Sequence, residues 1–114
     1  MKIPLDIYSL TPKRNIGTTI TATIQKPPGG NDVCEKNHAI SKASEKKYVQ
    51  YTLYLYGPAL KGGDNMHFKI MFLFASDLYP ISKKYGTNTD EWIGKSITLT
   101  VKESGPFHKW NIEA

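Results

Sequence analysis

The chain has 114 residues, of which 39% are hydrophobic and 22% charged, and its formal net charge is +5 at pH 7. This size and composition predict a single globular domain over residues 1–114, with one core. No stretch approaches the roughly 20 apolar residues that span a bilayer, and Pro4 and Asp6 interrupt the apolar run that a signal peptide needs. We therefore expect an intracellular, cytoplasmic protein that has no membrane partner.

The lone cysteine, Cys34, cannot form an internal disulfide, which agrees with a reducing compartment. Cys34 and His38 lie in the segment CEKNH, but a structural zinc site needs about four ligands. The other histidines, His67 and His108, belong to different predicted strands. A solvated loop explains the segment better, so we predict no metal and no cofactor.

The positive charge is spread over the first three quarters of the chain. Counting Lys and Arg against Asp and Glu gives +3 for residues 1–26, +1 for 27–47, +2 for 67–86 and −1 for 87–114. This balance mildly favours anionic partners, without a dense polybasic tail.

Alternating apolar and polar residues predict a first strand at 18–26, with Ile20, Ala22 and Ile24 on its inner face. The following PPGG sequence ends it, and the polar, turn-rich stretch 27–47 predicts a long loop. A second strand is expected at 48–56. Its two faces would be Val49, Tyr51, Leu53 and Leu55 on one side and Tyr48, Gln50, Thr52, Tyr54 and Tyr56 on the other.

After a loop at 57–65, the sequence predicts a third strand at 67–75. Its inward side chains would be Phe68, Ile70, Phe72 and Phe74, and its outward side chains His67, Lys69, Met71 and Leu73.

A short amphipathic helix is expected next, with Ser76 or Asp77 as its N-cap and Pro80 in its first turn. Gly86 is a suitable C-terminal stop. The apolar stripe of this helix would be Leu78, Ile81 and Tyr85.

Residues 89–94 predict a further helical turn that buries Trp92 and Ile93 and closes at Gly94. Two more strands are expected at 96–102 and 107–113, joined by a tight turn at 103–106. In the last strand Trp110 and Ile112 lie two residues apart and are expected on the same face. The first ten residues add either a short strand or a strap.

This element order, with one helix between strands three and four, is that of an all-β, five-stranded OB-like barrel. A barrel also removes the edges that short antiparallel strands would expose. The helix would close one barrel end and bury Leu78, Ile81 and the Trp92 turn. The rival architectures are an open five- to six-stranded sandwich and an SH3-like barrel.

The segment YGTNTDEWIGKSITL at residues 85–99 resembles a pattern of small phage-type and archaeal OB-fold proteins that bind single-stranded DNA. The resemblance covers about 15 residues of the chain. Over the remaining residues, only the order of the predicted strands and helix supports it. It implies single-stranded DNA as partner, a role in replication, recombination or repair, and a viral, plasmid or prokaryotic setting. For a virus, the compartment would be the host cytoplasm. Within the segment, Trp92, Ile93 and Gly94 are expected to serve the fold.

Binding of single strands needs cations for the phosphates and flat side chains on which bases stack. On an OB barrel the exposed face of strands two and three supplies this platform. The candidate nucleic-acid-binding residues on that face are Tyr48, Tyr54, Tyr56, Lys69 and Met71. Further candidates flank it or lie on other strands: Lys26, Lys46, Lys47, Lys102, Phe107 and Lys109. Each also has an ordinary structural interpretation, as a strand tyrosine in a cross-strand pair or as a solvated lysine.

The sequence carries no catalytic motif such as a P-loop, GxSxG or HExxH, so we do not expect an enzyme. The favoured hypothesis is a sequence-tolerant protein that binds single-stranded DNA or RNA. The alternative is a protein–protein interaction or assembly module, in which the exposed tyrosines and Met71 contact a partner chain or a second copy.

Overall fold

A computed structural model describes residues 7–29, 32–40, 47–58, 64–104 and 107–114. Over these residues the chain is mostly β-structure with one α-helix, as the sequence predicts. Its strands are β1 (Tyr8–Ser9), β2 (Ile20–Ile24), β3 (Cys34–Ile40), β4 (Lys47–Pro58), β5 (Asn65–Leu73), β6 (Ser96–Ser104) and β7 (Phe107–Glu113). Its helices are α1 (Ala75–Tyr85) and the short 3-10 helices η1 (Pro12–Asn15) and η2 (Thr89–Trp92).

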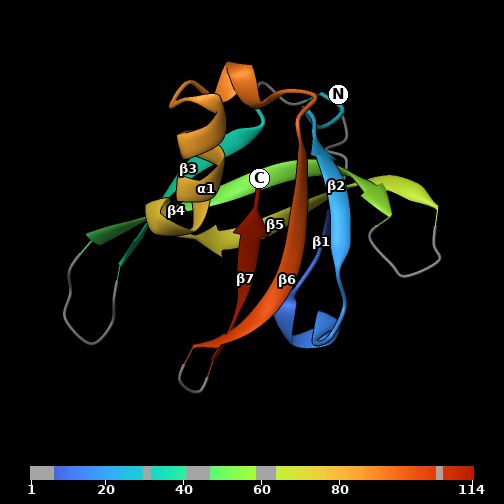
Figure 1. Ribbon diagram of the computed structural model, residues 1–114. Helices are drawn as coiled ribbons and strands as arrows, with labels where there is room; N and C mark the ends of the chain where they lie inside the picture. Colours follow the sequence, from blue (N-terminus) through green and yellow to red (C-terminus); the bar gives the residue numbers. More distant parts are fainter. Residues whose placement is uncertain (1–6, 30–31, 41–46, 59–63, 105–106) are drawn as a thin grey trace, which may run out of the picture.

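These seven strands form one sheet in the order β1-β5-β4-β2-β6-β7, and β3 pairs with β4. The pairs are antiparallel except β1 with β5. In Figure 1, β2, β6 and β7 cross in front of β4 and β5. The predicted closed barrel of five strands is wrong, because β5 and β7 are not paired anywhere in the described residues.

β3 occupies part of the segment predicted as a loop at 27–47. It pairs with β4 from Cys34 opposite Leu53 to Ile40 opposite Lys47. Backbone pairing does not require apolar side chains, and Glu35 is exposed on this edge strand. The polar composition that suggested a loop is therefore that of an edge strand. The predicted loop residues 41–46 lie outside the described residues.

β5 changes phase near its end. β4 advances two residues from Tyr51 to Leu53 while β5 advances three from Ile70 to Leu73, so β5 carries a bulge. Within it Phe72 has φ +62°, and its side chain is 69% exposed. Leu73 is buried instead. The predictions that Phe72 points inward and Leu73 outward are therefore wrong, whereas Ile70 is buried as expected.

α1 begins at Ala75 after an N-cap at Phe74, two residues earlier than a Ser76 cap would place it. The carboxylate of Asp77 accepts a hydrogen bond from the Phe74 backbone N–H at 2.8 Å, so Asp77 acts from the third helical position. Pro80 lies in the second turn, not in the first as predicted.

The turn after α1 packs much as the sequence indicates. Trp92 is buried, and its Nε1 donates to the Gly86 carbonyl at 2.8 Å. Gly94 has φ +83° where the chain reverses into β6. Ile93 is 41% exposed, so its predicted burial is wrong. The role of this segment in the fold is thereby confirmed for Trp92 and Gly94.

The core draws on the long strands and on α1. The predicted inward residues of β2 are buried, as are Leu78 and Ile81 of α1. β6 and β7 pair from Thr98 opposite Glu113 to Ser104 opposite Phe107. Residues 103 and 104, predicted in the turn, therefore belong to β6, and residues 105–106 lie outside the described residues. The largest fully buried side chains are Phe68, Leu10, Ile24, Leu53, Leu55, Ile70, Ile81, Ile97, Leu99 and Val33.

One of the two alternatives for the first ten residues is confirmed, because β1 is a short strand parallel to β5. Residues 1–6 lie outside the described part of the chain. Among the residues that the structure describes, no helix is long and apolar enough to cross a membrane.

Candidate functional site

The outer face of β4 and β5 carries a row of polar and aromatic side chains. Tyr54 lies opposite Lys69, and Tyr56 lies opposite His67. Their neighbours Leu53, Leu55, Phe68 and Ile70 fill the core, so alternation places these four on the other side of the sheet. The structure thus brings Tyr54, Tyr56 and Lys69 together, as the sequence predicts.

Tyr56 and His67 form a cross-strand aromatic pair. Their ring centroids are 4.8 Å apart and the rings are tilted by 57°. Both side chains are half-buried, as is Lys69. His67 was expected to point outward but was not among the predicted site residues. His67 is two residues before Lys69 in the predicted third strand, so alternation places both side chains on the same face, and this could have identified it.

Tyr54 differs from its neighbours because only 8% of it is exposed. Burial, a hydrogen bond to the Glu35 carboxylate and the charge of that group raise the pKa of Tyr54 from 10.0 to about 12. The prediction of a solvent-facing Tyr54 is therefore wrong. β3, which the sequence did not reveal, supplies Glu35, and Tyr54 joins β3 to β4 instead of offering a free ring.

Four predicted site residues fall wholly or partly outside the description. Lys46 lies outside the described residues. For Lys47, Tyr48 and Phe107 only the backbone is described: Lys47 pairs with Ile40, Tyr48 with Ala39 and Phe107 with Ser104.

The remaining predicted lysines lie on other elements. Lys26 follows β2 and is exposed. Lys102 on β6 is exposed and lies directly opposite Lys109 on β7. The ammonium group of Lys109 is 4.9 Å from the centroid of the Phe74 ring, a favourable cation–π distance. These lysines do not share the strand pairs of Tyr56 and Lys69.

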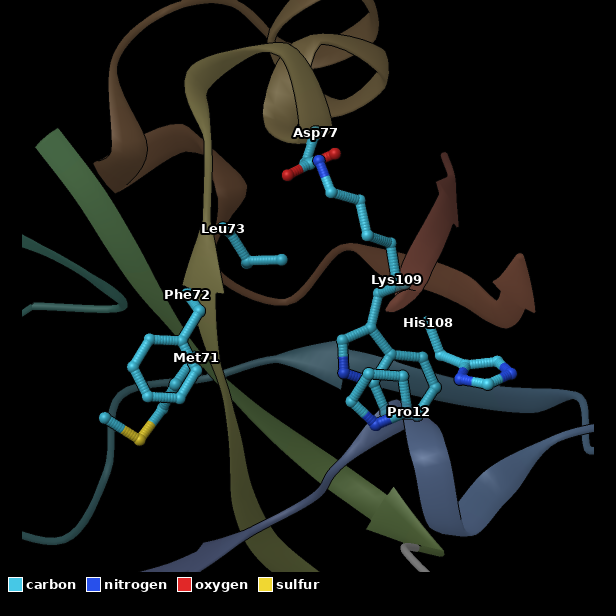
Figure 2. A pocket seen from close by; sticks show the side chains of 8 residues that line it. Pro12, Met71, Phe72, Leu73, Asp77, His108 and Lys109 are labelled. Carbon is cyan, nitrogen blue, oxygen red and sulfur yellow. The ribbon is translucent and has the colours of Figure 1, made fainter. Parts of the chain in front are cut away.

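Met71 and Lys109 meet in a small pocket that the sequence did not predict. It lies between the end of β5, the beginning of α1 and β7, and has a volume of about 120 Å³. Figure 2 shows the side chains that line it, with Lys109 extending toward Asp77. Its lining residues are Pro12, Met71, Phe72, Leu73, Asp77, His108, Lys109 and Trp110.

The cysteine is poorly suited to ligate a metal. Burial and the nearby charges of Asp32 and Glu35 raise the pKa of Cys34 from 9.0 to about 12, which keeps the thiol protonated. In the described part of the chain, no group of three or more His, Cys, Asp or Glu side chains is placed to hold a metal ion.

Comparison with models of known protein families, with curated proteins and with solved structures gives no match in any of the three.

Proposed function

We propose that this protein binds single-stranded nucleic acid on the outer face of β4 and β5. The observation that carries the proposal is the half-buried Tyr56–His67 pair, two residues along each strand from the Tyr54–Lys69 pair and therefore on the same face. Flat rings accept stacked bases of any sequence, and a neighbouring ammonium group pairs with a phosphate. This combination is what sequence-tolerant binding of a single strand requires.

The pairing order supports an OB-like architecture for this function. β4 pairs with β2 and β5, and β6 pairs with β2 and β7. An OB fold is a partly open Greek-key barrel whose second and third strands bind oligonucleotides. Without β1 and β3, the second and third strands here are β4 and β5.

His67 adds a second flat ring to this face, half-buried beside the ring of Tyr56. Its Nδ1 is buried, so the ring and not this nitrogen is the part that a base would contact. The resemblance of residues 85–99 to proteins that bind single-stranded DNA favours DNA over RNA. It also favours a role in replication, recombination or repair in a viral or prokaryotic setting.

The proposal is tested by fluorescence anisotropy of a labelled 15-nucleotide oligo(dT) titrated at several salt concentrations. Tyr56→Ala should weaken binding about 5- to 150-fold, since one stacked base contributes about 1–3 kcal/mol. Lys69→Gln should reduce the slope of log affinity against log salt by about 0.7. Tyr79→Ala and Lys83→Gln are matched controls, because both residues are exposed on α1. A folded protein that does not bind oligo(dT) at low salt contradicts the proposal.

The alternative is an assembly module, and the exposed Phe72 next to the half-buried Met71 favours it, since contiguous exposed apolar side chains often contact partners. It predicts a molar mass that rises with protein concentration in sedimentation or light scattering. Replacing Tyr56 by Ala would then dissociate the assembly. A constant monomer mass together with oligo(dT) binding supports nucleic-acid binding instead.

A further inference from the structure

The pocket at the end of β5 lies where the sheet fails to close. In the described residues, β1 pairs with β5 only at Phe68 and Lys69, and β7 pairs with β6 alone. The end of β5 and β7 both line the pocket, and Pro12 of η1 completes its wall. The opening between two strands is therefore a recess with aromatic and basic walls.

Phe72 is held in an unfavourable conformation at the rim. Its φ of +62° lies in the left-handed region, which a bulky residue rarely adopts. Its ring nevertheless remains 69% exposed, so burial does not compensate for the strain. Strained residues of this kind cluster at ligand sites. Figure 2 shows Phe72 beside Met71, whose side chain is half-buried.

Trp110 supplies a second and independent indication of a ligand. The residue is 3% exposed and lines the pocket, and its buried Nε1 has no hydrogen-bond partner among the described residues. The other indole, that of Trp92, donates to a carbonyl at 2.8 Å. A buried donor left without an acceptor is costly, and a ligand carrying an acceptor atom would satisfy it.

The charges around the pocket leave a positive excess only when Lys102 is counted. Lys109, His108 and Asp77 line the pocket, and Lys109 extends toward the Asp77 carboxylate, which offsets its charge (Figure 2). Lys102 lies directly opposite Lys109 in the β6–β7 ladder. Like charges in that position repel each other, and a phosphate between them would relieve the repulsion.

We infer that this pocket receives one unpaired base of a bound single strand. The inference rests on the proposed function and adds a second contact region to it. The base presents an acceptor atom to Trp110 Nε1 and its face to Phe72, while Lys109 and Lys102 neutralise the adjoining phosphate. The strand then continues from Lys69 past Met71 into the recess.

The first test uses thymidine 5′-monophosphate and follows the two indole N–H signals of the ¹⁵N-labelled protein by NMR. The chain has two tryptophans, so Trp110→Phe and Trp92→Phe assign the signals. The signal of Trp110 should move during the titration and that of Trp92 should not. Deoxyribose 5-phosphate, which lacks the base, should leave both unchanged. An unmoved Trp110 signal at saturating nucleotide overturns the inference.

The second test measures oligo(dT) binding of the variants. Trp110→Phe should weaken it about 2- to 12-fold by loss of one hydrogen bond, and Phe72→Gly about 5- to 150-fold by loss of one stacked base. Trp92→Phe removes an indole donor outside the pocket and should leave affinity unchanged. Phe72 is at the surface, so its variant decides the question even if Trp110→Phe does not fold.

The outcomes separate the two proposals. If Tyr56→Ala weakens oligo(dT) binding and Phe72→Gly does not, the pocket inference is wrong and the proposed function stands. If the wild-type protein ignores oligo(dT) but the Trp110 signal moves with the mononucleotide, the proposed function is wrong and the pocket binds a nucleotide. If neither probe binds, both are wrong.

Discussion

Replacing Phe72 by glycine and by alanine separates the backbone strain of the β5 bulge from the packing of the side chain. Both variants remove the ring, which is already 69% exposed, so both lose the same modest burial. They differ in the backbone. Alanine keeps the cost of the left-handed conformation at φ +62°, whereas glycine adopts that conformation freely.

The difference between the two variants can be worked out from these terms. A residue with a Cβ in the left-handed region is disfavoured by about 1–2 kcal/mol. The greater conformational freedom of glycine in the unfolded chain reduces this advantage of Phe72→Gly by about 0.4–1 kcal/mol. Phe72→Gly should therefore be more stable than Phe72→Ala by about 0.5–1 kcal/mol.

Urea unfolding followed by circular dichroism measures this difference. Thr21, which is exposed on β2, is the matched control. At that ordinary strand position Thr21→Gly should be less stable than Thr21→Ala by about 0.5–1 kcal/mol. The sign should thus reverse between positions 21 and 72. If Phe72→Ala proves as stable as Phe72→Gly, the bulge is not strained and our interpretation of the pocket rim is wrong.

Two further predictions concern pH and packing. In the folded protein the pKa values of Tyr54 and Cys34 are raised to about 12, from ordinary values of 10.0 and 9.0. Each protonated group therefore stabilises the fold fully below its ordinary pKa, and this stabilisation is lost as the pH rises toward 12. The urea midpoint of the wild-type protein should accordingly fall between pH 9 and pH 11, and that of Tyr54→Phe should fall less. If the difference in midpoint between the wild-type protein and Tyr54→Phe stays the same over this pH range, the phenol of Tyr54 is not buried. A Cβ at Gly57 would lie 3.2 Å from the Ala22 Cα and the Thr21 carbonyl oxygen. Gly57→Ala should therefore lower the free energy of unfolding by about 1–3 kcal/mol, and an unaffected denaturation midpoint would show that β2 and β4 separate easily.

Much of the strand layout could be predicted because it depends on local patterns. Ile20, Ala22 and Ile24 alternate strictly, and β7 begins and ends at the predicted residues 107 and 113. β3 could not be predicted, because its polar residues are ordered by pairing with β4 rather than by their own burial. The prediction also ended β4 at residue 56, whereas the strand continues to Pro58, because its last two residues are ordered by pairing with β5.

The candidate site was predicted in part. The side-chain faces of β4 and β5 follow from period two as far as Ile70, which is why Tyr56 and Lys69 could be named. Beyond Ile70 the bulge shifts the phase, and the sequence gives no warning because Phe72 is not a glycine. The side-chain hydrogen bond of Tyr54 also depends on a residue that is distant in the sequence, Glu35 of β3. The pocket joins β5 to β7, a proximity that only the three-dimensional fold creates.

The salt dependence of oligo(dT) binding by the wild-type protein and Lys69→Gln is the most direct test of the nucleic-acid interface. We predict that log affinity falls linearly with log salt, and that the variant shows a slope shallower by about 0.7, the share of one phosphate contact. The same slope in both proteins, or no binding by a folded wild-type protein at low salt, would contradict the assignment of the β4–β5 face.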